Sequence, residues 1–167
     1  MKRTKLSSKE EVTFQTDLSE AHKVENKLAD YYKANYNCKV ETSQKLGSFP
    51  AWDLSIYFID HDVNLTFECK QDKMVWTGNV AVENQRTLKN GIVQPTCISI
   101  SKADICSYYF NGTYYLIPTD ELRQMIKNKL YSVIVANAGG DNQTSIYLFP
   151  VNIFTKYATD IRTLLGT

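Results

Sequence analysis

Two carboxylates and one lysine have the residue types and the spacing of a metal-dependent hydrolytic site. Asp53 lies in one segment that alternates apolar and polar residues, and Glu68 and Lys70 lie in the next such segment. Carboxylate oxygens, completed by the backbone carbonyl of Cys69 and by water, suit Mg²⁺ or Mn²⁺ better than zinc. A lysine beside such a cation can orient or deprotonate an attacking water, or stabilise charge in the transition state. These residues predict hydrolysis assisted by a hard divalent cation.

The two segments, residues 52–59 and 63–70, must form a hairpin for this chemistry. Their alternation predicts two strands, and Asp-His-Asp between them predicts a turn. Directly opposed residues share a face, so the apolar rows match across a tight turn when Leu54 pairs with Phe67. This register places Asp53 opposite Glu68, and a slip by two residues leaves their Cβ atoms about 5 to 8 Å apart. Two carboxylates so placed repel each other, and we expect positive charge between them.

A third carboxylate, Glu25, is expected inside the apolar stripe of a helix. The spacing predicts this helix from Asp17 to about Asn35, with Asp17 and Glu20 as a capping box. The stripe is formed by residues at helical spacing: Leu18, Ala21, Val24, Leu28 and Tyr32. A carboxylate buried there is costly unless it is paired or binds a cation.

A simpler interpretation treats Lys70 as the neutralising partner of Asp53 and Glu68 on a solvated face. The tripeptide carboxylate-x-Lys occurs twice, at 25–27 and at 68–70, which is about what chance produces in this composition. The tripeptide alone therefore carries no weight. The opposed Asp53, the hairpin and the expected burial of Glu25 favour the metal site.

The remaining elements predict an α/β fold with a mixed central β-sheet flanked by helices. Asn111-Gly112 is a strong hairpin-turn signal between two strand-like segments, and Thr119 is expected to cap a second helix. The predicted elements are strands at 105–110, 113–117, 131–136 and 145–149 and a helix at 119–130, while residues 72–87 stay loosely assigned. We expect a flexible N-terminal arm over residues 1–16 and a single domain over residues 17–167.

Composition restricts the partners and the location. There are 19 Lys and Arg against 18 Asp and Glu, a formal net charge of +1, so a polyanion must be bound by a local patch. No apolar run reaches the roughly 18 to 20 residues of a membrane span, and the first residues are polar. We therefore expect a cytoplasmic protein without a membrane partner. Abundant Asn, Lys, Tyr and Ile are compatible with a phage or viral gene.

The order of these residues resembles the PD-(D/E)xK nuclease superfamily. Glu25 on a helix, Asp53 at the start of a strand and Glu68-Cys69-Lys70 on the next strand are most similar in spacing to small Holliday-junction-resolvase-like and phage-type members. The resemblance covers about residues 17–84, and it departs where the family's leading Pro-Asp reads Pro50-Ala51-Trp52-Asp53.

This resemblance implies a restriction-endonuclease-like core and Mg²⁺-dependent hydrolysis of DNA phosphodiester bonds. It implies that Glu25, Asp53 and Glu68 are metal ligands and that Lys70 is the catalytic lysine. Members often carry a further polar residue after the core motif, for which Gln71 and Glu83 are the candidates.

Four residues are candidates for DNA contact. Ser101 and Lys102 are expected near a helix start and suit a phosphate, and Lys73 and Arg86 follow the motif along the chain. Cleavage of two strands would favour a symmetric homodimer. The alternatives are a non-catalytic nucleic-acid-binding or protein-binding module on the same fold, and a viral protein that blocks or mimics a host factor.

Overall fold

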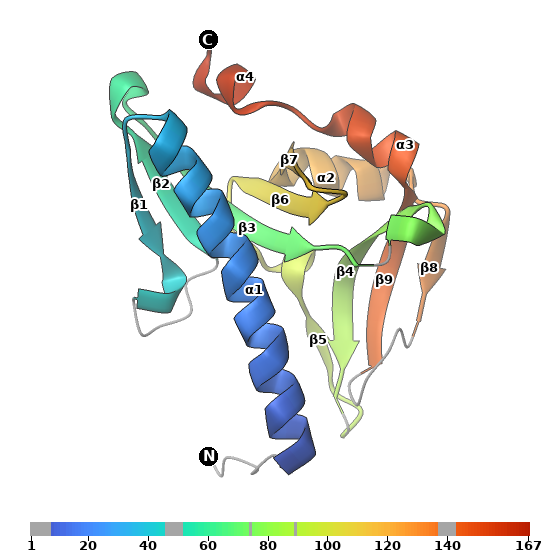
Figure 1. Cartoon of the computed structure of the whole chain (residues 1–167). Helices are drawn as coiled ribbons and strands as arrows, with labels where there is room; N and C mark the ends of the chain where they lie inside the picture. Colours follow the sequence, from blue (N-terminus) through green and yellow to red (C-terminus); the bar gives the residue numbers. More distant parts are fainter. Residues whose placement is uncertain (1–7, 46–51, 74, 89, 137–142) are drawn as a thin grey trace.

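The computed structural model describes residues 8–45, 52–73, 75–88, 90–136 and 143–167, and within these ranges the strands form two sheets (Figure 1). The first sheet is mixed and has the order β1-β2-β3-β6-β7. Its strands are β1 (Cys38–Thr42), β2 (Leu54–Phe58), β3 (Val63–Gln71), β6 (Ile105–Phe110) and β7 (Thr113–Pro118). Only β3 and β6 run parallel among these neighbours. The predicted α/β class with a mixed sheet is confirmed.

A second, antiparallel sheet has the order β5-β4-β9-β8, which the prediction of one central sheet did not include. Its strands are β5 (Val93–Pro95), β4 (Asn79–Thr87), β9 (Gln143–Pro150) and β8 (Val133–Val135). The strands predicted at 131–136 and 145–149 are confirmed as β8 and β9. The loosely assigned residues 72–87 contain β4, which occupies the chain between the parallel strands β3 and β6.

The long helix α1 (Ser8–Asn35) crosses in front of β3 on one face of the mixed sheet (Figure 1). It begins at Ser8, so the predicted start at Asp17 is wrong. Neither Pro nor Gly interrupts the sequence of residues 8–16, so the helix can extend through them. No helix in the described part of the chain is long and apolar enough to cross a membrane.

The hairpin of β2 and β3 has the predicted register. Leu54 pairs with Phe67, Ile56 with Leu65 and Phe58 with Val63. The turn closes through η2 (Ile59–His61) and Asp62, which has a left-handed φ of 52°. Leu54, Ile56, Phe58 and Phe67 are almost completely buried against α1, in a core that includes Leu28, Ala29 and Tyr32. The pairing of the apolar residues of β2 and β3 thus determines which polar residues lie on the opposite face of the hairpin.

The second predicted hairpin is also confirmed, as β6 and β7 joined by Asn111 and Gly112. Both turn residues have positive φ, 49° and 76°, as a two-residue type I′ turn requires. On the face of the mixed sheet away from α1, Cys106 and Ile117 pack in a second core with Val82 of β4. The β6–β7 hairpin therefore packs against the second sheet through this core.

Helix α2 (Thr119–Lys127) confirms the second predicted helix, although it ends before residue 130. Thr119 does not cap it through its side chain: Thr119 is buried, and its hydroxyl lies 3.5 Å from the Cys106 sulfur. The packing of this hydroxyl against β6 replaces the predicted cap. The chain continues through two short helices that the sequence did not predict, α3 (Val151–Phe154) and α4 (Ile161–Leu165).

Candidate functional site

Asp53 is held by backbone hydrogen bonds on both sides at the start of β2. Its N–H donates to the Phe67 carbonyl at 2.8 Å, and its own carbonyl accepts from the Ser43 N–H at 2.9 Å. One carboxylate oxygen accepts from the Cys69 N–H at 2.7 Å. The side chain therefore reaches across to β3 at the residue between Glu68 and Lys70.

Glu68 and Lys70 lie on the same face of β3 and form an ion pair. The Lys70 Nζ lies 2.9 Å from one Glu68 carboxylate oxygen, and the Glu68 side chain is only 14% exposed. The second Glu68 oxygen lies 3.5 Å from the Ser101 hydroxyl. The neutralising role considered for Lys70 is thus present, although Lys70 interacts electrostatically with three carboxylates, Glu25 as well as Asp53 and Glu68.

Glu25 is buried on α1, as the helical spacing predicts, with only 7% of its surface exposed. One of its carboxylate oxygens accepts a hydrogen bond from the Gln44 side-chain amide. Burial raises the pKa of Glu25, and the nearby Glu68 carboxylate raises it further, while Gln44 and Lys70 oppose the rise. Glu25 therefore belongs electrostatically to the same group as Glu68 and Lys70.

Burial raises the pKa of Asp53 to about 7, with smaller contributions in the same direction from the carboxylates of Glu68 and Glu25. The Cys69 N–H and the Lys70 ammonium oppose this rise. We call Glu25, Asp53, Glu68 and Lys70 the acidic cluster. Fully ionised, its three carboxylates exceed its one lysine by two negative charges. Such a site is stabilised either by a proton on Asp53 or by an added cation.

The donor atoms of the acidic cluster fit a hard divalent cation. They are carboxylate oxygens, and the backbone carbonyl of Cys69 lies in the same stretch of β3. The Cys69 thiol is no ligand of this kind, because its burial raises its pKa and keeps it protonated. In the described ranges no group of three or more His, Cys, Asp and Glu is already placed to hold a metal. A cation would have to replace partners that the carboxylates have now, such as Gln44 and Lys70.

The two candidates for a further polar residue lie apart from these side chains. Gln71 is exposed, and by strand alternation it lies on the opposite face of β3 from Glu68 and Lys70. Glu83 is exposed on β4 in the second sheet. The structure therefore groups neither residue with the acidic cluster.

The four candidates for DNA contact have different surroundings. Ser101 is buried next to Glu68, whereas Lys102 is exposed. Lys73 forms an ion pair with Glu20 of α1, and Arg86 is exposed on β4. Contact with DNA stays a prediction for these residues.

Several supporting contacts join residues that are far apart in the sequence. Gln44 reaches Glu25 from η1 (Ser43–Lys45), which directly follows β1. The Tyr114 hydroxyl of β7 donates to the Val24 carbonyl at 2.9 Å, next to Glu25 in the chain. Sequence reasoning missed both contacts, since no local pattern reports a bond between distant segments.

Comparisons of this chain with protein-family models, with curated proteins and with solved structures find no match.

Proposed function

We propose that the protein is a metal-dependent nuclease that hydrolyses DNA phosphodiester bonds on a restriction-endonuclease-like core. The observation that carries this proposal is the electrostatic interaction of Glu25, Asp53 and Glu68 with one another and with Lys70, with Glu25 buried and the pKa of Asp53 raised to about 7. A protein seldom retains such a repulsive group of one buried and two half-buried carboxylates without a use for it. Oxygen donors beside a lysine suit metal-assisted hydrolysis.

In this proposal Glu25, Asp53 and Glu68 hold Mg²⁺ or Mn²⁺, with the Cys69 carbonyl as a further oxygen donor. The cation supplies Lewis-acid stabilisation and an acidified water. Lys70 keeps its ammonium 2.9 Å from Glu68, where it can orient the attacking water or stabilise charge on the phosphate. The Cys69 N–H keeps Asp53 turned toward β3.

The fold supports the proposal in its outline. A helix is followed by three antiparallel strands, and the third of these, β3, carries Glu68 and Lys70 at the border with the parallel strand β6. We also propose a cytoplasmic, phage-type enzyme that acts as a homodimer, because two-strand cleavage suits two symmetric sites.

Cleavage assays with two conservative variants test the catalytic proposal. The purified protein should cut plasmid DNA or a synthetic four-way junction in Mg²⁺. Asp53→Asn and Lys70→Met should each lower the rate by at least about 100-fold, because a metal ligand or the ammonium beside the attacking water is lost. Asp30→Asn and Lys39→Met are matched controls, since both residues are exposed. Equal cleavage by the wild type and both cluster variants would refute the proposed site.

Calorimetric titration with Mn²⁺ separates this proposal from a non-catalytic binding module. The nuclease proposal expects binding that Glu68→Ala weakens strongly. A wild-type protein that binds DNA without binding Mn²⁺, or whose Mn²⁺ binding is unaffected by Glu68→Ala, supports the module instead.

A further inference from the structure

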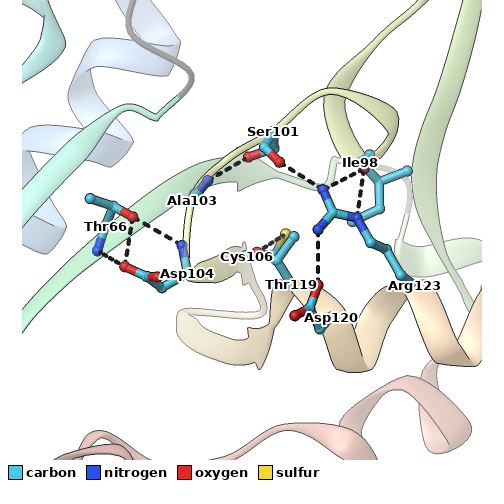
Figure 2. Close-up of polar contacts among 9 residues, drawn as sticks. All are labelled: Thr66, Ile98, Ser101, Ala103, Asp104, Cys106, Thr119, Asp120 and Arg123. Carbon is cyan, nitrogen blue, oxygen red and sulfur yellow. Dashed lines mark hydrogen bonds and ion pairs between the residues drawn. The ribbon is translucent and has the colours of Figure 1, made fainter.

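Residues 97–104, here called the Ser101 loop, are tied to β3 by contacts between Asp104 and Thr66 (Figure 2). The Asp104 carboxylate accepts from the Thr66 N–H at 2.8 Å and from the Thr66 hydroxyl at 2.7 Å. In return the Asp104 N–H donates to the Thr66 hydroxyl at 3.0 Å. Thr66 is two residues from Glu68 and therefore shares its face of the strand. The end of the loop thus has a fixed position relative to Glu68.

Arg123 of α2 holds the other part of the Ser101 loop. Its guanidinium donates to the Ser101 carbonyl at 2.7 Å and, through two nitrogens, to the Ile98 carbonyl at 3.3 Å (Figure 2). A third nitrogen pairs with Asp120 at 3.0 Å. Ile98 is buried in the second core. The planar guanidinium thus binds two backbone carbonyls of the loop at once, which a lysine ammonium cannot reproduce.

The contacts of Ser101 direct its hydroxyl proton toward Glu68. Ser101 is only 4% exposed, and its hydroxyl oxygen accepts a hydrogen bond from the Ala103 N–H at 3.2 Å. This contact uses a lone pair and leaves the hydroxyl proton to be donated elsewhere. The Glu68 oxygen not paired with Lys70 lies 3.5 Å away. Glu68 therefore has Lys70 at one oxygen and Ser101 at the other.

We propose that Ser101, itself held by Arg123, is a positioning residue that orients the Glu68 carboxylate for the divalent cation. This inference rests on the proposed metal-dependent function, and it gives Ser101 a role at the ligand rather than at a DNA phosphate. Loss of an outer hydrogen bond to a ligating carboxylate typically weakens metal affinity by about 10-fold to 100-fold. Because 3.5 Å is a long contact, we expect the lower end of that range.

Mn²⁺ titration of the full chain by calorimetry tests the role of Ser101. Ser101→Ala should raise the Kd for Mn²⁺ by about 10-fold, and Ser101→Thr, which keeps a hydroxyl, should restore most of the affinity. Ser99→Ala is a matched control in the same loop, because the Ser99 hydroxyl donates to the Asn84 carbonyl at 2.7 Å. In cleavage assays Ser101→Ala should raise the Mg²⁺ concentration needed for half-maximal rate. The rate at saturating Mg²⁺ should stay within about 2-fold of wild type.

A double-mutant comparison tests whether Arg123 acts through Ser101. Arg123→Met should weaken Mn²⁺ binding in the wild-type background and add little in the Ser101→Ala background, since the hydroxyl that it positions is already gone. Equal losses in both backgrounds would show that Arg123 does not act through Ser101.

Mn²⁺ binding by the wild type and the variants distinguishes failure of the proposed function from failure of the role of Ser101. A wild-type protein that binds no Mn²⁺ overturns both the proposed function and this inference. Wild-type binding that Glu68→Ala abolishes, but that Ser101→Ala changes no more than Ser99→Ala does, overturns this inference alone.

Discussion

The raised pKa of Asp53 predicts that the metal-free protein loses stability as pH rises toward and beyond neutrality. The carboxyl group has a pKa of about 7 in the folded protein and a model value of 3.8, which represents the unfolded chain. Between these values the folded protein holds a proton that the unfolded chain has released. The stabilisation is therefore fully present below about pH 4, and it is lost as pH rises through 7.

The magnitude follows from the same two pKa values. Between pH 5 and pH 8 the folded state must give up its proton, while the unfolded state is already ionised. Proton linkage converts this difference into a decrease of about 2 to 3 kcal/mol in the free energy of unfolding. Asp53→Asn removes the titration but keeps an oxygen that can accept the Cys69 N–H.

Urea unfolding in EDTA at pH 5 and pH 8 measures this effect. The decrease in unfolding free energy over this interval should be about 2 to 3 kcal/mol larger for the wild type than for Asp53→Asn. Asp30→Asn is the control, because Asp30 is exposed on α1, and its pH dependence should match that of the wild type. Titrating groups outside the acidic cluster cancel in these comparisons, since all three proteins contain them.

If the unfolding free energies of the wild type and Asp53→Asn change in parallel with pH, the pKa of Asp53 is not raised in the folded protein. A difference of the opposite sign would also refute the raised pKa. That result would mean that Lys70 and the Cys69 N–H stabilise the charged carboxylate more than burial and the neighbouring acids destabilise it.

Two further predictions concern the hairpins that build the site, both measured by urea unfolding at pH 7. Phe67→Ala should cost about 3 to 5 kcal/mol, because Phe67 is 0% exposed and packs 5.7 Å from the Tyr32 ring; a loss below 1 kcal/mol would contradict this packing. Gly112→Ala should cost about 1 kcal/mol, since the added Cβ meets no atom within 4 Å and the penalty comes from the φ of 76°. Asn111→Gly, which accepts the same turn, should not destabilise the hairpin by that amount.

The register of β2 and β3 was predictable because local rules agree with one another there. Alternation places Leu54 and Phe67 on one face, and the short turn permits few pairings. Burial of that face against α1 then leaves Asp53 and Glu68, at the alternate positions, outside this core. The helical position of Glu25 was predictable for a similar reason, since three and four residue spacings define one face of a helix.

The errors occurred where local signals were ambiguous or absent. The capping box at Asp17 and Glu20 is a common local pattern, and the helix continues through it because nothing in residues 8–16 breaks a helix. The second sheet was missed as a unit because β4 pairs with β9, more than fifty residues later in the sequence. Alternation identifies a strand, but it does not identify the distant strand with which it pairs.

By itself, the sequence determined the residue types of the acidic cluster and the hairpin that carries most of them. These features depend on residue type, on periodicity and on pairing across a short turn. Only the tertiary structure decided which distant groups surround the carboxylates. Gln44 reaches Glu25, and Ser101, held by Arg123, reaches Glu68. The physical reason is that these contacts form only when separate segments of the chain pack together. The same packing desolvates Asp53 and raises its pKa, and no local sequence pattern records it.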